Sequence, residues 1–227
     1  MILLRRRGIE AVRPSTPSGS PPVVASVGAV TNAPQVDVPS GVAAGNLILV
    51  IIGREWDQTV FPGPTTITVD GFTYATSARL DDEGWTSATF IFYKYATGAD
   101  TGIYQVHPDD GTGGHILACM SVRITGGPTS GNPFVDTFHS ASALSGATAT
   151  VASFTPGAAN SLVLMAGWTD DQPFTTYPGA PWTTHANSNL PSGNLLFASW
   201  AQTSPTATGA LNYAASDDTM MLAATIR

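Results

Sequence analysis

Four pairs of acidic residues are the first positions in this sequence that could do chemistry. Adjacent carboxylates can bind a divalent cation or act as an acid and a base. Each pair lies beside Gly, Pro or Thr in an expected loop, where Asp favours turn conformations. None has the alternating spacing of an EF-hand loop, and HPDDGTGGH at 107–115 comes nearest to a cation-binding turn. We therefore interpret these pairs as solvated turns: Asp81 and Asp82, Asp109 and Asp110, Asp170 and Asp171, Asp217 and Asp218.

Histidine, cysteine and glycine patterns indicate no cofactor chemistry. The four histidines are scattered, and no H-E-x-x-H motif or Cys/His cluster accompanies them. The single cysteine, Cys119, lies in the apolar run HILACMSV and is expected to be a small buried hydrophobe. The sequence lacks a G-x-S-x-G elbow, a P-loop and a dinucleotide-binding fingerprint. We expect no metal, no cofactor and no enzyme activity, with a glycan-cleaving enzyme as the weakest alternative, because a glycosidase pair leaves little local signal.

Five tryptophans raise the alternative of carbohydrate binding. Trp56, Trp85 and Trp182 lie near expected turns and are our candidates for glycan or other surface contact. Trp200 lies within an apolar run where Tyr95 stands in a similar earlier run, so we assign it to the core. A glycan-binding receptor module therefore stays open as an alternative function.

The elements that position these residues are expected to be short strands. Only 11% of the residues are charged, and β-branched or aromatic runs alternate with turn residues. This pattern predicts an all-β fold, an antiparallel, jelly-roll-like β-sandwich with little or no helix. The expected strands are 23–30, 47–53, 65–69, 88–96, 102–107, 115–124, 134–139, 149–154, 161–168, 195–202, 209–215 and 219–226.

Three of these runs recur in the same order in both halves of the sequence. GNLILVIIG resembles NSLVLMAGW, FYKYATGAD resembles FASWAQTS with Phe92 against Phe197, and CMSVRITG resembles MLAATIR. The alternative is that apolar strands of any β protein look alike. A true duplication predicts two similar antiparallel units, about 45–126 and 160–227, packed face to face within a single domain, 23–227.

Positive charge is concentrated in the first residues. Residues 1–13 contain four of the nine basic residues and one acidic residue, a net charge of +3, and the remainder of the chain carries −10. An acidic body would repel a phosphate backbone, so we expect no nucleic-acid partner. No apolar run is long enough for a membrane span, so we expect no membrane partner. Residues 1–22 are rich in Pro, Ser and Gly and are expected to form an extended N-terminal arm that contacts a partner through Arg5, Arg6, Arg7 and Arg13.

The runs named above also carry a family resemblance. GNLILVIIG, GWTSATFIFYKYATGAD, RITGGPTSGNPFVDT, ASFTPGAANSLVLMAGW and TGALNYAASDDTMMLAATIR resemble phage and prophage virion-associated β-sandwich proteins over roughly residues 40–227. The shared motifs are structural, so no catalytic residue carries over. The usual P-x-G-W-T turn is replaced by VDGFTYA at 69–75 and APWTTHA at 180–186, and loop functions do not carry over either.

The resemblance implies a virion structural protein: a capsid decoration (cement) protein or, alternatively, a tail or fibre subunit. It implies virion proteins as partners, the major capsid protein or tail subunits. It also implies a homo-oligomer, often a trimer in such proteins, located on the capsid surface or tail after assembly in the host cytoplasm. We expect the arm to anchor the protein on a neighbouring subunit, with the β body projecting outward.

Overall fold

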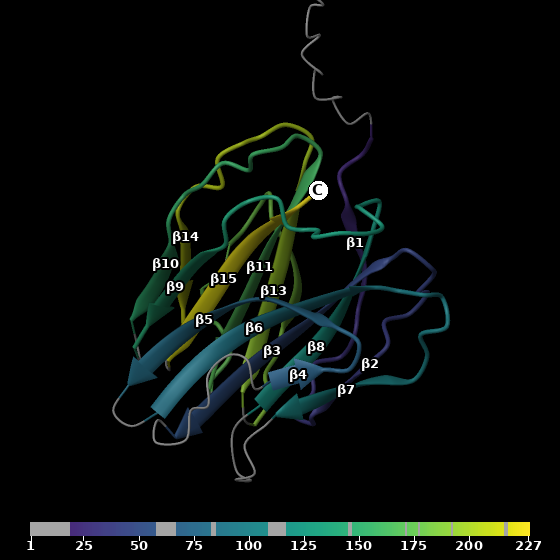
Figure 1. Ribbon diagram of the computed structural model, residues 1–227. Helices are drawn as coiled ribbons and strands as arrows, with labels where there is room; N and C mark the ends of the chain where they lie inside the picture. The colour runs from purple at the N-terminus through teal and green to yellow at the C-terminus, as the bar shows by residue number, and fades with distance from the viewer. Residues whose placement is uncertain are drawn as a thin grey trace, which may run out of the picture.

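The structure is a computed structural model that describes residues 19–57, 67–82, 85–108, 117–144, 147–170, 172–176, 178–191, 193–215 and 218–227. Two five-stranded antiparallel sheets pack face to face at its centre (Figure 1). The order in the first sheet is β1 (Val23–Val27), β8 (Leu117–Thr125), β3 (Leu47–Asp57), β6 (Trp85–Tyr95) and β5 (Thr73–Asp82). The order in the second is β12 (Thr183–Asn187), β13 (Asn194–Gln202), β11 (Ser161–Thr169), β15 (Thr219–Ile226) and β9 (His139–Ala143).

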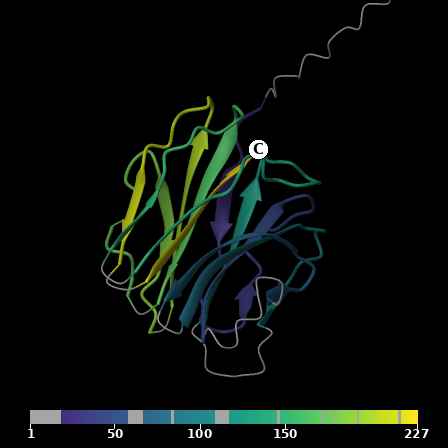
Figure 2. The same cartoon turned by 60° about the vertical axis from the view of Figure 1, so that its left-hand side comes forward.

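A smaller sheet covers the outer face of each large sheet. On the first sheet it consists of β2 (Gln35–Asp37), β7 (Ile103–Pro108) and β4 (Ile67–Val69); on the second, of β10 (Thr148–Val151) and β14 (Leu211–Ala214). Figure 2 shows the purple-to-teal first half and the green-to-yellow second half side by side. The described residues contain no helix, so the predicted all-β, antiparallel fold is confirmed.

Burial on both faces explains why the central strands are continuously apolar. In β3, Leu47, Leu49 and Ile51 point into the inner core between the two large sheets. The intervening residues, Ile48, Val50 and Ile52, point into an outer core beneath β2, β7 and β4. A strand that is buried on both faces has no polar face to alternate with. The run LILVII therefore predicts the central strand of a multilayered molecule.

The two halves repeat one topology. In the first half β3 lies between β8 and β6, with β1 beside β8 and β5 beside β6. In the second half β11 lies between β15 and β13, with β9 beside β15 and β12 beside β13. The outer pairs also correspond, since β2 pairs with β7 as β10 pairs with β14. Each half thus includes two strands, β1 and β2 or β9 and β10, that precede the predicted half-units.

Pairing partners fix which residues of the two halves are equivalent. Leu47 lies opposite Ile124, and Leu162 lies opposite Ile226, as the sequence match requires. On the next strand, Ile51 pairs with Ile91 whereas the equivalent Ala166 pairs with Phe197. The predicted match of Phe92 with Phe197 is therefore wrong by one residue. A shift of one residue reverses the face of every side chain, so Phe92 points to an outer core and Phe197 to the inner core.

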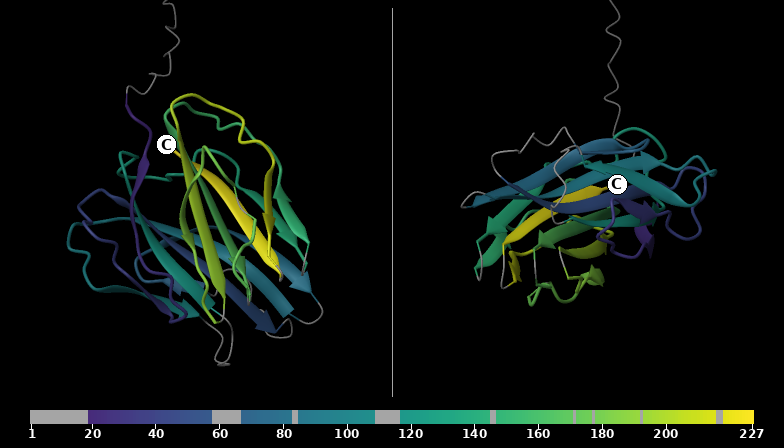
Figure 3. Two further views of the ribbon diagram at one scale, coloured as in Figure 1. Left: turned by 180° about the vertical axis from the view of Figure 1, so that it is seen from behind. Right: turned by 90° about the horizontal axis from the view of Figure 1, so that it is seen from below.

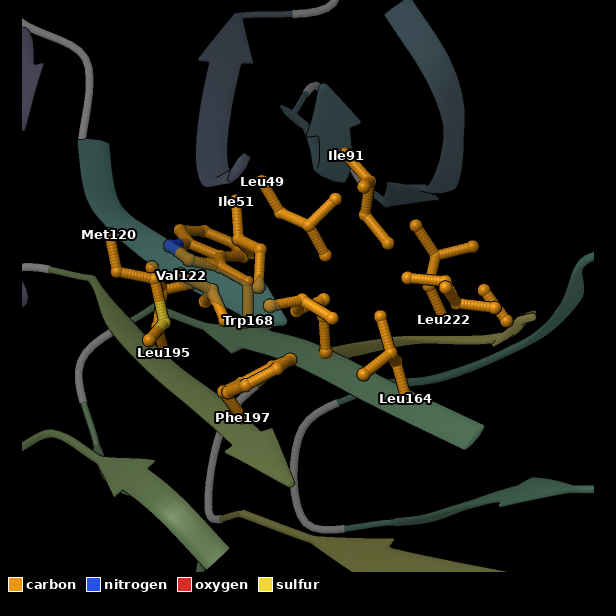
Figure 4. Close-up of a cluster of buried hydrophobic side chains, with 14 of the residues drawn as sticks. Leu49, Ile51, Ile91, Met120, Val122, Leu164, Trp168, Leu195, Phe197 and Leu222 are labelled. Atoms are coloured by element: carbon orange, nitrogen blue, oxygen red, sulfur yellow. The ribbon is translucent and has the colours of Figure 1, made fainter. Parts of the chain in front are cut away.

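The inner core centres on one contact between equivalent positions. Trp168 is fully buried among side chains of both large sheets, including Ile51 and Leu195 (Figure 4). Its equivalent in the first half is Gly53, and a Cβ atom built on Gly53 would lie 1.6 Å from Cδ1 of Trp168. The glycine therefore leaves the space that the indole of the equivalent residue fills.

Four of the observed strands were not predicted, and all are short or polar: β2, β5, β9 and β12. The predicted strand 134–139 is also wrong, because only Phe134 makes an isolated bridge, to Ile226, and β9 begins at His139. Side chains hold this segment instead: the Asn132 amide oxygen accepts from the Phe134 N–H, and the Asp136 carboxylate accepts from the Gly157 N–H.

Candidate functional site

The sequence-predicted contact residues do not assemble into one site. Arg5, Arg6, Arg7 and Arg13 lie outside the described residues. Trp56 and Trp85 fall at neighbouring ends of the paired strands β3 and β6, and their side chains also lie outside the described set. The proposal of Trp182 as a surface contact is wrong, because this side chain is only 9% exposed and packs 6.0 Å from the Trp200 ring. It fills the outer core beneath β10 and β14.

The candidates for metal and thiol chemistry also stay apart. The described part of the chain contains no group of three or more His, Cys, Asp or Glu that could hold a metal ion. Asp81 lies within β5 and not in a turn, and it accepts hydrogen bonds from Arg79 and Thr86. Cys119 is completely buried in an outer core, so the prediction of a small buried hydrophobe is confirmed, and burial raises the pKa of its thiol. No helix that could span a membrane occurs in the part of the chain that the structure describes.

A groove lies at one edge of the molecule, where β1 of the first sheet faces β12 and β13 of the second. Figure 3 shows this edge from behind, with the purple β1 beside the yellow-green strands of the second half. The groove has a volume of about 460 Å³, within the usual range for ligand sites. Its apolar wall consists of Val23, Val24, Leu162, Pro181, Trp200 and Ala201. Its polar residues are Thr183, His185 and Ser199.

A two-fold relation between the halves makes this edge equivalent to the opposite one. β3 faces β11, β6 faces β15 and β8 faces β13. Because β1 corresponds to β9 and β12 to β5, the contact of β5 with β9 is the second copy of the same edge. We call the edge between β5 and β9 the closed edge and the edge between β1 and β12 the open edge.

Three aromatic side chains fill the closed edge. Tyr93 and Tyr95 lie on β6 with their rings 6.4 Å apart, and the Tyr93 ring lies 5.7 Å from that of Phe134. Phe134 is 7% exposed and also contacts Phe138, with ring centroids 5.0 Å apart. Edge-to-face aromatic pairs of this kind add stability beyond the area that they bury. The closed edge is therefore sealed by the chain's own aromatic residues.

Small side chains occupy the equivalent positions at the open edge. Ser199 replaces Tyr93, and Ala201 replaces Tyr95, as the pairing of β13 with β11 shows. Val24 lies opposite Ile124 as Phe134 lies opposite Ile226, so valine replaces phenylalanine. Loss of three aromatic rings at equivalent places leaves the groove.

A shared β-bulge positions the polar side of the groove. The pairing of β5 with β6 shifts between Tyr74 and Thr76, and that of β12 with β13 shifts between Thr184 and Ala186. The extra residue is Ala75 in the first half and His185 in the second. Bulges redirect a side chain, and here the redirected imidazole reaches Ser199, with Nε2 2.7 Å from Oγ.

The His185–Ser199 pair has the spacing of a base and a nucleophile. Burial lowers the pKa of the imidazole below 6.5, so the ring is neutral at neutral pH and can accept the serine proton. Orientation by a carboxylate normally completes such a pair, and the described residues that line the groove include no Asp or Glu. The arrangement therefore gives a neutral, mainly apolar groove with one internal hydrogen bond.

The groove continues along β13. A second hollow of about 140 Å³ shares Trp200 and Ala201 with it and extends to Ser204 and Thr206. Trp200 is half-buried and forms part of both walls. Together they favour an extended occupant over a compact one.

Comparison with known proteins adds no relative: no family model, no curated protein and no solved structure matches this chain. The groove was missed in the sequence because Phe92 was matched with Phe197, which set Tyr95 against Trp200. With the register shifted by one residue, Tyr93 and Tyr95 stand against Ser199 and Ala201, and that loss of aromatic residues is the signal that would have found the groove.

Proposed function

We propose that this chain is a structural protein of a phage virion, a capsid decoration (cement) subunit anchored through its N-terminal arm. Its partners are then virion proteins, either the major capsid protein or tail subunits, and its location is the particle surface after assembly in the host cytoplasm. The resemblance over residues 40–227 supports this function. A tail or fibre subunit would be assembled from the same parts.

One observation carries the proposal. The arm leads directly into β1, and β1 is hydrogen-bonded into a large sheet, with Val23 paired to Thr125 and Val24 to Ile124. An anchoring segment must be connected to a mechanically stable part of the folded body. The sheet behind β1 is packed on both faces, so a load on the arm would be carried by two cores.

The charge distribution supports the same function. The first thirteen residues carry +3 and the rest of the chain −10, so the arm and the body attract different surfaces. Arginine forms bidentate pairs with carboxylates, so we expect the arm to select an acidic protein surface.

Particle binding tests the proposal with the full chain. We expect replacement of Arg5, Arg6 and Arg7 by Gln to weaken binding to undecorated particles by about tenfold, since three charge-assisted contacts are lost. It should also reduce the salt dependence of binding. The matched control is Arg79→Gln, because Arg79 is an exposed arginine of the body that contacts Asp81. Unchanged binding by the triple variant would contradict the proposal, and imaging of decorated particles would separate head from tail.

A further inference from the structure

The open edge has the form of a site prepared for bulky apolar side chains. At the closed edge the equivalent space is filled by the aromatic rings of Tyr93, Tyr95 and Phe134. At the open edge six of the nine lining residues are apolar, and Val23 is 46% exposed. An occupant that brings large aliphatic or aromatic groups would restore the packing that the first half achieves by itself.

Among the segments outside the described residues, the N-terminal one contains the longest apolar run. Residues 1–18 precede the described structure, and their longest apolar run is MILL, Met1–Leu4. These four side chains are long, flexible or branched, and such groups adapt to irregular apolar grooves. The same segment carries the arginines that favour an acidic surface.

A second copy of the chain is a partner of opposite net charge for these arginines. The body that contains the groove has a net charge of −10, opposite in sign to the arm. His185 adds no positive charge at neutral pH, because burial lowers the pKa of its imidazole. A chain of 18 residues spans up to about 60 Å when extended, and a body of this size is about 45 Å across. Prolines at 14, 17, 21 and 22 favour an extended course over a reversal onto the same copy.

We propose that the groove between β1 and β12 receives residues Met1–Leu4 of a second copy of this chain. This inference rests on the proposed function, in which the arm is an anchor. It states which subunit the arm binds when the protein is not attached to a particle. The contact is heterologous: each copy donates an arm from one place and accepts one at another. Such a contact closes into a ring or continues as a chain of copies.

An apolar peptide fits the groove better than a carbohydrate does. His185 and Ser199 hydrogen-bond to each other, which satisfies part of the polar capacity that a sugar would use. The edge backbone of β1 adds the means to hold an extended peptide, since among the described strands β1 pairs only with β8. Carbohydrate binding in the groove is therefore an alternative outcome of the test.

A mixing experiment with full chains tests the inference. The arm variant carries Leu3→Glu and Leu4→Glu and keeps the groove. The groove variant carries Ser199→Tyr, which restores the residue of the closed edge and keeps the arm; Val24→Phe is a second version, in case tyrosine perturbs the fold. Leu144→Glu is the matched control for an acidic substitution, because Leu144 is 48% exposed and lies away from the groove. Circular dichroism confirms that each variant is folded, and sedimentation velocity gives its mass.

We expect the wild type and Leu144→Glu to self-associate and each variant alone to be monomeric. An equimolar mixture of the arm variant and the groove variant should form a species with the mass of two chains, because one intact arm meets one intact groove. A monomeric wild type, or a mixture that stays monomeric, would overturn the inference. So would oligosaccharide binding that Ser199→Tyr abolishes while self-association persists. If the wild type is monomeric but still binds particles through its arm, the proposed function stands, and only the inferred binding site of the arm is wrong.

Discussion

The two edges of this molecule are built alike but end differently. At the closed edge Tyr93 and Phe134 pack ring against ring, whereas at the open edge Ser199 and Val24 take their places. Strand pairing matches at the bulge that precedes Thr76 and Ala186. It differs at the third position, since Phe134 makes an isolated bridge to Ile226 whereas Val24 lies within β1. Side-chain volume at the three equivalent positions distinguishes the sealed edge from the groove. A duplicated fold can thus keep one edge for stability and release the other for binding.

The outer faces of the halves show the same division. Lys94 and Trp200 are equivalent positions on β6 and β13. The Lys94 ammonium lies 4.5 Å from the centre of the Tyr104 ring and pairs with the Asp100 carboxylate. Trp200 instead packs against Trp182 and lines the groove. At this position an ion pair stabilises the first half, whereas the second half presents an aromatic surface.

The largest expected effect lies at the centre, where the halves meet. Trp168→Ala should lower the free energy of unfolding by about 4 kcal/mol, because a buried indole leaves a large cavity. Gly53→Ala should cost about 3 kcal/mol, since its methyl group would overlap the indole. In the Trp168→Ala background Gly53→Ala should cost much less, which denaturant unfolding of the double variant measures.

The control for this cycle is Gly179→Ala, because a Cβ built on Gly179 meets no atom within 4 Å. Equal costs of Gly53→Ala in both backgrounds would show that the two equivalent positions do not compete for the same space.

Opening the closed edge comes next in size. Phe134→Ala should cost about 3 kcal/mol, because Phe134 is 7% exposed and packs against Tyr93. The matched change at the open edge, Val24→Ala, should cost about 1 kcal/mol, since a smaller and partly exposed side chain is shortened. Thermal or denaturant unfolding gives both values. Similar losses at the two edges would remove the distinction on which the groove depends.

Acid should affect the first half through Asp100. Burial raises the pKa of this carboxyl. Hydrogen bonds from Lys94 and from the Thr97 N–H, together with the charge of Lys94, lower the pKa by more than burial raises it, so the net pKa lies below 3.8. The carboxylate therefore stabilises the fold above that value and loses this effect as the pH falls through the folded pKa. Between pH 5 and pH 3 we expect the wild type to lose about 1 kcal/mol more than Asp100→Asn. Equal slopes in unfolding experiments would count against the role of the Lys94–Asp100 pair.

The smallest expected effect concerns His185 at the open edge. Its folded pKa is lowered by burial, so the unfolded chain takes up a proton near pH 6.5 before the folded chain does. The His185 contribution to stability should be constant above pH 7 and fall only slightly as the pH drops through 6.5 to the folded pKa, because solvent screens the partly exposed ring. His185→Gln should remove this component. Titration of the imidazole by NMR checks the direction, and a midpoint above 6.5 would contradict it.

Sequence patterns predicted the central strands but missed three of the four outermost strands of the large sheets, β5, β9 and β12. Strands buried on both faces, such as LILVII, carry a strong apolar signal. The edge strand β5 is mostly polar, since only some of its residues face a core, and it resembles a loop in sequence. The groove was not predictable from single residues, because it results from the absence of aromatic rings at Ser199 and Ala201, where the first half has Tyr93 and Tyr95. It emerges only when the halves are compared in the register that strand pairing defines.

The central claim is that the open edge binds another chain where the closed edge is filled by its own. The most direct test places a photo-crosslinking amino acid at position 3 in a mixture of ¹⁴N-labelled and ¹⁵N-labelled protein. Mass spectrometry then identifies the crosslinked peptides and whether their labels differ. We predict mixed-label crosslinks from residue 3 to peptides that contain Val24 or Trp200. Crosslinks that join peptides of one label only, or that avoid the groove, would contradict the account.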